Sequence, residues 1–222
     1  MKKITLYLFS ILLLPFISLG QKSENLQGAF LSSVDNKQIL WLFVDKYFSQ
    51  IVYSENKYIA TKGGPFTFDG KQLNVHLEYD DEDPTQVGTN LVISVRKNQE
   101  NLKQGQELFE RQASKQQALD GLWRITGRQQ GATRQEIQRG DRKTIKILVD
   151  GYFQWIAINP AQKGFYGTGG GLYSFINSTY TEHILFFSRD NSRVGNELNF
   201  NGEIIDGAWH HHGKSSKGDP IH

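Results

Sequence analysis

A repeat with a spacing of 107 residues constrains the fold of this chain more than any other feature. Residues 169–187 (GGGLYSFINSTYTEHILFF) indicate two strands joined by an Asn-Ser turn, and residues 63–80 (GGPFTFDGKQLNVHLEYD) are a weaker copy. The same shift aligns pairs of identical residues along both copies: Gly63 with Gly170, Gly64 with Gly171, Phe68 with Phe175, His76 with His183, Val87 with Val194, Gly88 with Gly195 and Leu91 with Leu198. A period of this length in a chain of 222 residues predicts two units of similar architecture.

Short segments rich in β-branched and aromatic residues recur in both copies and are typical of strands. In the first copy they span residues 26–33, 38–45, 47–53, 66–68, 73–79, 90–96 and 107–111. In the second copy they span residues 144–149, 153–158, 172–175, 180–187, 197–200 and 203–212. Even spacing without a long helix predicts an all-β protein with a small antiparallel barrel, or barrel-like sandwich, in each half.

The chain divides into four segments. Residues 1–20 resemble a secretory signal peptide, because Lys2 and Lys3 precede a short apolar run that ends in small residues before Gln21. Residues 21–112 form the first repeat, residues 113–118 a polar linker, and residues 119–222 the second repeat. The second repeat carries an inserted polar loop at residues 129–141, and it ends where the first repeat has a full strand, so we expect it to lack its last strand.

Composition narrows the classes of partner and site. The chain has no cysteine, which rules out disulfides, thiolate metal sites and a thiol nucleophile. Its 25 Lys and Arg residues nearly balance 23 Asp and Glu residues, so we expect no nucleic-acid partner. The signal predicts a secreted or periplasmic protein with no membrane span after cleavage.

The start LDGLW at residues 119–123 and the later GGG-x-Y and Y-T-E-H block resemble lipocalin-like domains of secreted bacterial proteins of unknown function. In lipocalins a Gly-x-Trp lies near the first strand, and Gly121 and Trp123 match it here. The first repeat matches more loosely, with Phe30 in place of the tryptophan and Val75 in place of the glutamate. The resemblance implies an eight-stranded up-and-down barrel that can hold a small apolar ligand, and it implies no catalytic residues.

Strand alternation selects the candidate ligand-binding residues of the second repeat. Tyr180, Glu182, Ile184 and Phe186 are two apart, so they are predicted to share an inward face. Glu182 is the polar exception and is either a ligand anchor or a structural partner of Arg124, Lys146 or a tyrosine hydroxyl. The predicted ligand-binding set is Glu182, Tyr180, Trp155, Tyr173 and Phe186.

The histidines are weaker candidates. His76 and His183 fall on the opposite, outer face, where a cross-strand contact is expected. His210 and His212 share one face, whereas His211 lies with Trp209, so a metal site would need His222 as well. We therefore predict no metal and no cofactor.

Arginines crowd the start of the second repeat and form either a patch for an anionic partner or a solvated loop. They are Arg124, Arg128, Arg134, Arg139 and Arg142. No phosphate-binding or nucleophile-elbow pattern occurs in the sequence. The sequence thus predicts an exported, non-enzymatic binding module that holds a small apolar ligand in its second barrel. The alternative is a structural or protein-interaction module with filled barrels and no ligand.

Overall fold

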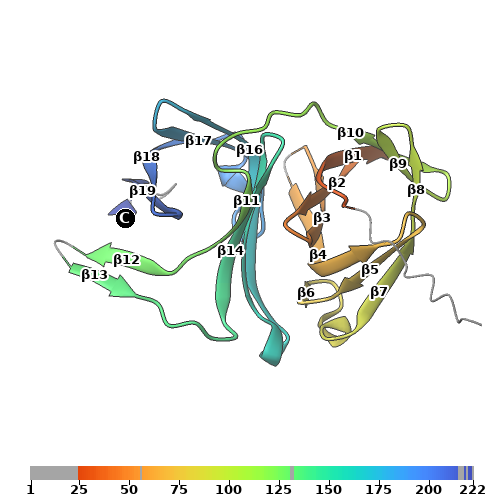
Figure 1. Cartoon of the computed structure of the whole chain (residues 1–222), viewed down its shortest axis with the longest axis horizontal. Helices are drawn as coiled ribbons and strands as arrows, with labels where there is room; N and C mark the ends of the chain where they lie inside the picture. The colour runs from red at the N-terminus through yellow and green to blue at the C-terminus, as the bar shows by residue number, and fades with distance from the viewer. Residues whose placement is uncertain (1–24, 56, 131–132, 215–217, 219, 222) are drawn as a thin grey trace, which may run out of the picture.

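The computed structural model describes residues 25–55, 57–130, 133–214, 218 and 220–221, and most of these residues lie in antiparallel strands. The predicted all-β class is confirmed, because the strands form two separate barrel-like units that lie side by side (Figure 1). The expected signal peptide at residues 1–20 lies outside the described residues. Within the described ranges, no helix is long and apolar enough to cross a membrane.

The first unit, called the first barrel below, is a ten-stranded sheet. Its strands are β1 (Gly28–Val34), β2 (Lys37–Val44), β3 (Tyr47–Ser54), β4 (Lys57–Phe68), β5 (Gln72–His76), β6 (Tyr79–Asp80), β7 (Asn90–Ser94), β8 (Arg96–Asn98), β9 (Asn101–Gln104) and β10 (Glu107–Arg111). The order is β7-β5-β4-β3-β2-β1-β10-β9-β8, with β6 paired to β4. Its two end strands, β7 and β8, adjoin each other in the chain through Val95, so the sheet curls into a nearly closed barrel.

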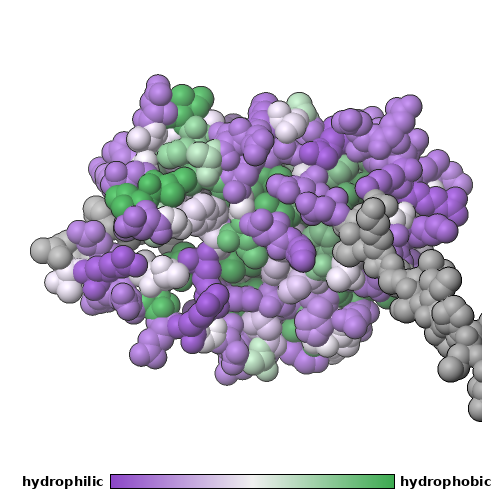
Figure 2. All heavy atoms as spheres, in the orientation of Figure 1, coloured by the Kyte–Doolittle hydropathy of each residue, from purple (hydrophilic) through white to green (hydrophobic). Residues whose placement is uncertain are grey.

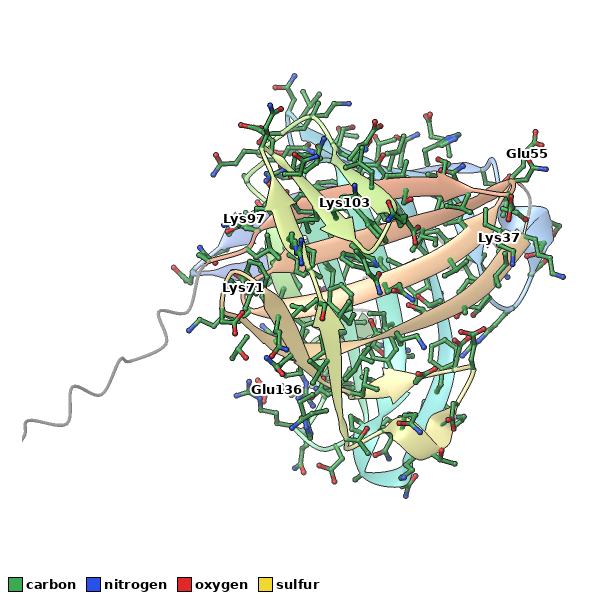
Figure 3. All side chains as sticks on the ribbon, turned by 90° about the vertical axis from the view of Figure 1, so that its right-hand side faces the viewer. Lys37, Glu55, Lys71, Lys97, Lys103 and Glu136 are labelled. Atoms are coloured by element: carbon green, nitrogen blue, oxygen red, sulfur yellow. The ribbon has the colours of Figure 1, made fainter. Side chains whose placement is uncertain are left out.

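Side chains fill the interior of the first barrel. Its core residues are Leu26, Phe30, Trp41, Phe43, Phe48, Phe66, Phe68, Leu73, Val75, Leu77, Ile93, Val95, Leu102 and Phe109. Trp41 stacks on Phe109 of β10 with ring centroids 3.8 Å apart. Charged side chains, including Lys71, Lys97 and Lys103, lie on the outside (Figure 3). The first barrel is therefore a packed body with a polar exterior.

The second unit, called the second sheet below, is an eight-stranded curled sheet. Its strands, in spatial order, are β11 (Gly121–Arg124), β14 (Lys143–Val149), β15 (Tyr152–Asn159), β16 (Gly164–Ile176), β17 (Thr179–Phe187), β18 (Glu197–Ile205), β19 (Ala208–Lys214) and β20 (Pro220–Ile221). Among the described residues, β11 and β20 are its two edges and do not pair with each other. The second sheet is thus a half-barrel.

The remaining elements are short. The inserted segment, expected to be a loop, instead contains a two-stranded hairpin of β12 (Gly127–Gln130) and β13 (Thr133–Glu136), which pairs with neither sheet and lies below β18 and β19 in the view of Figure 1. Gly127 pairs with Glu136 in this hairpin, so backbone bonding orders a polar segment that has little apolar surface to bury. Three 3₁₀ turns complete the chain: η1 (Pro84–Gln86), η2 (Pro160–Gln162) and η3 (Asn191–Arg193).

The glycines and histidines of the repeat occupy matching places where two backbones approach closely. A Cβ added to Gly64 would lie 2.0 Å from the carbonyl oxygen of His76, and one added to Gly171 would lie 2.0 Å from that of His183. Both separations are far below any van der Waals contact, so only glycine fits there. Glycine therefore recurs at these two places because the neighbouring backbone leaves no room for a side chain.

The first barrel and the second sheet pack against each other through a shared core. The shared core contains Ala29, Leu40, Leu42, Val44, Tyr47, Ile51, Tyr53 and Tyr79 of the first barrel, and Ile145, Ile147, Val149, Ile156, Ile158 and Phe186 of the second sheet. The β2–β3 turn at Asp45 and the β14–β15 turn at Asp150 correspond with a shift of 105 residues, which matches Leu40 with Ile145, Leu42 with Ile147 and Val44 with Val149. The shift of 107 residues matches Tyr79 with Phe186. The two units therefore meet through corresponding faces, as the subunits of a two-fold dimer do.

Reciprocal hydrogen bonds complete this pseudo-symmetry. Asp150, in the β14–β15 turn, accepts a hydrogen bond from the backbone N–H of Ala29 on β1 at 3.2 Å. Asp45, in the equivalent β2–β3 turn, accepts one from the backbone N–H of Leu122 on β11 at 2.8 Å. Each unit thus caps the first strand of the other.

Candidate functional site

The interior face of the second sheet is rich in aromatic side chains. Its buried members are Leu119, Leu148, Phe153, Tyr173, Tyr180, Ile184, Phe187 and Phe200. Partly buried side chains pack against them: Trp123, Trp155, Phe175, Leu198 and Trp209. This set is called the aromatic face below. Four of the five predicted ligand-binding residues lie on or beside it, namely Tyr173, Tyr180, Glu182 and Trp155.

Glu182 forms a buried ion pair at the centre of the aromatic face. Its carboxylate accepts a hydrogen bond from Lys146 Nζ at 2.5 Å and from the Tyr180 hydroxyl at 2.9 Å. The Lys146 ammonium lies 4.7 Å from the Tyr180 ring centroid, 5.3 Å from that of Trp209 and 5.4 Å from that of Phe153. The carboxylate charge is therefore balanced within the fold, as the structural interpretation of Glu182 requires.

The two tyrosines of the predicted set donate hydrogen bonds to carboxylates. Burial, and then Glu182, raises the pKa of Tyr180 well above its usual value. Burial, and then the hydrogen bond to Asp120, raises the pKa of Tyr173. Both hydroxyls stay protonated at neutral pH, so these side chains build the face and carry no charge.

Phe186 does not lie on the aromatic face, and this part of the prediction is wrong. The β16–β17 register pairs Gly170 with Phe186 but Gly171 with Ile184, so Leu185 is an extra residue in a β-bulge. The bulge reverses the alternation, and Phe186 joins the shared core, where its ring centroid lies 5.4 Å from that of Tyr53. Phe187 takes the inward place instead and contacts the Trp155 ring.

The predicted ligand-binding set left out most of the aromatic face, including Trp123 and Trp209, and also the adjacent His211. Trp123 on β11 contacts Trp209 on β19 with ring centroids 5.8 Å apart. His211 packs against Trp209 at 4.9 Å, and burial, followed by Lys146 and His212, lowers the pKa of His211 to about 3. Strand alternation had placed His211 with Trp209, whereas the Trp123 contact depends on how the sheet curls.

The outward histidines lie where alternation places them. His76 is exposed and contacts Asn90 across the β5–β7 pair, with Nδ1 and Oδ1 3.1 Å apart. His183 is exposed at the matching place on β17. His210 and His212 are exposed on β19, and His222 lies outside the described residues. Within the described ranges, no group of three or more His, Asp or Glu side chains is arranged to hold a metal ion.

The aromatic face includes partly exposed aromatic side chains, whereas the aromatic side chains of the first-barrel core are buried. Among the described residues, the partly buried apolar side chains against the first-barrel core are Ile39 and Leu91 alone, neither of them aromatic. Figure 2 shows hydrophobic residues gathered over the second sheet near β18 and β19, whereas the first barrel is largely hydrophilic on this side. Exposed isoleucines of this half are Ile125, Ile137, Ile176, Ile204 and Ile205.

Two cavities lie in the first barrel. One of about 220 Å³ is lined by residues that include Phe30, Leu102 and Arg111. The other, of about 370 Å³, is lined by residues that include Lys62 and Ile93. None of the predicted ligand-binding residues lines either cavity.

Comparison with protein-family models, with curated proteins and with solved structures found no match.

Proposed function

We propose that this protein is an exported, non-enzymatic binding module whose ligand surface is the aromatic face. The observation that carries the proposal is the contrast between equivalent surfaces. The aromatic side chains of the first-barrel core are buried, whereas the second sheet leaves Trp123, Trp155 and Trp209 partly exposed on the same face. Large aromatic side chains left partly in water favour association with an apolar surface.

The chemistry of the aromatic face suits an uncharged, apolar ligand. The carboxylate of Glu182 and the ammonium of Lys146 neutralise each other at 2.5 Å, so neither offers a net charge to a ligand. We therefore assign Glu182 to holding Lys146 beneath the rings, in place of the direct anchoring role considered from the sequence. The filled first barrel supports the structural alternative for that half, where it serves as a rigid support.

Titration with an apolar fluorescent dye tests this proposal. We expect saturable binding to the purified protein, and Trp155→Ala should weaken it at least tenfold, because Trp155 is one of the partly exposed tryptophans of the aromatic face. The matched control is Ile176→Ala, which removes an exposed apolar side chain at the end of β16, the strand that pairs with the Trp155 strand β15. Equal loss of affinity in both variants, or no dye binding to the unchanged protein, would refute the proposal.

A further inference from the structure

The wall of the first barrel has a gap beside β7. In the second sheet, β18 pairs with β19 from Ile205 back to Phe200. The equivalent of Phe200 in the first barrel is Ile93 of β7, but β9 turns back through Gly105 into β10 and pairs with β8 only as far as Arg96. Within the described sheet, β7 is therefore an end strand that is paired on its β5 side. The larger first-barrel cavity, of about 370 Å³, lies at this gap and is called the β7 cavity below.

The β7 cavity has an apolar side and a polar edge. Leu91 and Ile93, which pack with the first-barrel core, form its apolar side. Ser94 of β7 and Gln104 of β9 line it as well, and both are exposed, so the β7 cavity opens to solvent between the two strands. Its volume lies within the range of small-molecule sites.

Glu107 brings a carboxylate to the β7 cavity. It is the cross-strand partner of Gln104 and is two residues from the core residue Phe109, so its side chain lies on the same inward face as both. In the part of the chain that the structure describes, its Oε1 is buried and has no hydrogen-bond partner. The cation that lines the β7 cavity, Lys62, is already paired with Asp80 at 3.0 Å. The charge that remains beside the β7 cavity is therefore negative.

The free edge of β7 adds hydrogen-bond acceptors to this carboxylate. The N–H of Val95 bonds to the carbonyl of Lys71 on the β5 side at 2.8 Å. Backbone groups of successive strand residues point to opposite sides, so the carbonyls of Ser94 and Val92 face away from β5. Both residues line the β7 cavity. Acceptors thus converge there with a negative charge.

We propose that the β7 cavity binds a small organic cation, namely a primary ammonium group on a compact apolar body. An ammonium group has three donors and no acceptor, which matches a carboxylate oxygen and backbone carbonyls. The apolar body packs on Leu91 and Ile93. This ligand differs in charge from the uncharged ligand of the aromatic face. The β7 cavity therefore adds a second site, in the half to which the proposed function gives a supporting role.

Calorimetric titration with benzylamine tests this assignment. We expect saturable binding to the purified protein. Benzyl alcohol, which has the same ring but no charge, should bind roughly tenfold more weakly or worse, because hydrogen bonds between charged groups are the stronger kind.

Two pairs of variants locate the site. Glu107→Gln should weaken benzylamine binding by about tenfold or more and leave benzyl alcohol unaffected. Its matched control is Glu110→Gln, at an exposed position on the other face of β10, which should change neither. Gln104→Trp should block the β7 cavity to both probes, whereas Lys103→Trp, on the outside of the first barrel (Figure 3), should block it to neither. The Glu107 pair decides the matter if Gln104→Trp does not fold.

The outcomes separate this site from the aromatic face. Equal affinity for benzylamine and benzyl alcohol, equal effects of Glu107→Gln and Glu110→Gln, or no benzylamine binding at millimolar concentration would overturn the cation site. Trp155→Ala should leave benzylamine binding unchanged, and Gln104→Trp should leave binding of the apolar dye unchanged. Loss of benzylamine binding in Trp155→Ala would instead place the cation on the aromatic face and exclude the β7 cavity.

Discussion

At the scale of single residues, the two halves differ in charge at two equivalent positions. Val75 and Trp41 lie in the apolar core of the first barrel. Their equivalents in the second sheet are Glu182 and Lys146, which form the buried ion pair. An apolar pair in one copy is thus replaced by two opposite charges in the other, and both members of the pair change together.

Removing one member of this pair should destabilise the protein strongly. Glu182→Leu leaves the Lys146 ammonium buried without its carboxylate, which should cost about 3–5 kcal/mol of unfolding free energy. The double variant Lys146→Met with Glu182→Leu should regain most of that loss, because a buried pair exchanged for apolar side chains is often neutral. Urea unfolding of both variants measures this. A double variant no more stable than Glu182→Leu would contradict the assigned role.

His211 should make stability depend on pH. Its pKa falls to about 3 in the folded protein, from 6.5 in the unfolded chain, so the unfolded state binds the extra proton below pH 6.5. The stability it supports is therefore complete above that pH and is lost as the pH falls toward 3. The loss between pH 7.5 and pH 5 should be about 2 kcal/mol. In His211→Phe, urea unfolding across this range should give a flatter profile, whereas His210→Phe should match the unchanged protein.

Sequence reasoning reached some of these residues and not others, for physical reasons. Alternation and the repeat were enough to single out Glu182, and Lys146 was among its three expected kinds of partner. Trp123 and Trp209 are far apart in sequence and lie on different strands, so their contact depends on the curl of the sheet. Such a contact leaves no periodic signal in the chain.

At the scale of elements, alternation predicts a strand's faces only as far as the next bulge. Beyond Leu185 the faces of β17 reverse, which sends Phe186 into the shared core and Phe187 to the aromatic face. The β16–β17 pair thus contributes side chains to both the shared core and the aromatic face.

Gln154 on β15 joins the second sheet to the first barrel, since its side chain bonds to Ser49 and Thr61 of the first barrel and to Thr168 of the second sheet.

Gln154 should be a structural link between the two units. Its side chain is fully buried, and its Oε1 accepts a hydrogen bond from Ser49 Oγ at 2.5 Å. Gln154→Leu keeps the volume but leaves the buried Ser49 donor unpaired, which should cost about 1–3 kcal/mol. In a Tyr79→Phe background, adding Ser49→Ala should recover part of this; the background is needed because Ser49 Oγ also accepts a hydrogen bond from the buried Tyr79 hydroxyl at 2.7 Å. Thermal or urea unfolding tests the pair, and additive losses in the double variant would argue against the link.

At the scale of the whole molecule, the shared core joins two units that the sequence presents as tandem repeats. The sequence indicates that two strands are covered on both faces, because β2 and β14 each contain apolar residues at successive positions. The sequence does not show what covers the second face. In each unit, this second face is covered by the equivalent face of the other unit, and that arrangement depends on the pseudo-symmetry of the fold.

The two units should therefore unfold together. Ile147→Ala opens a cavity in the shared core and should cost about 2–5 kcal/mol. Because Leu42 and Ile147 occupy equivalent places, Leu42→Ala should cost a similar amount. Hydrogen-exchange mass spectrometry in urea reports each half separately, and peptides from both the first barrel and the second sheet should shift their midpoints equally in either variant. A shift confined to the half that carries the substitution would show that the units are independent and that the shared core contributes little to stability.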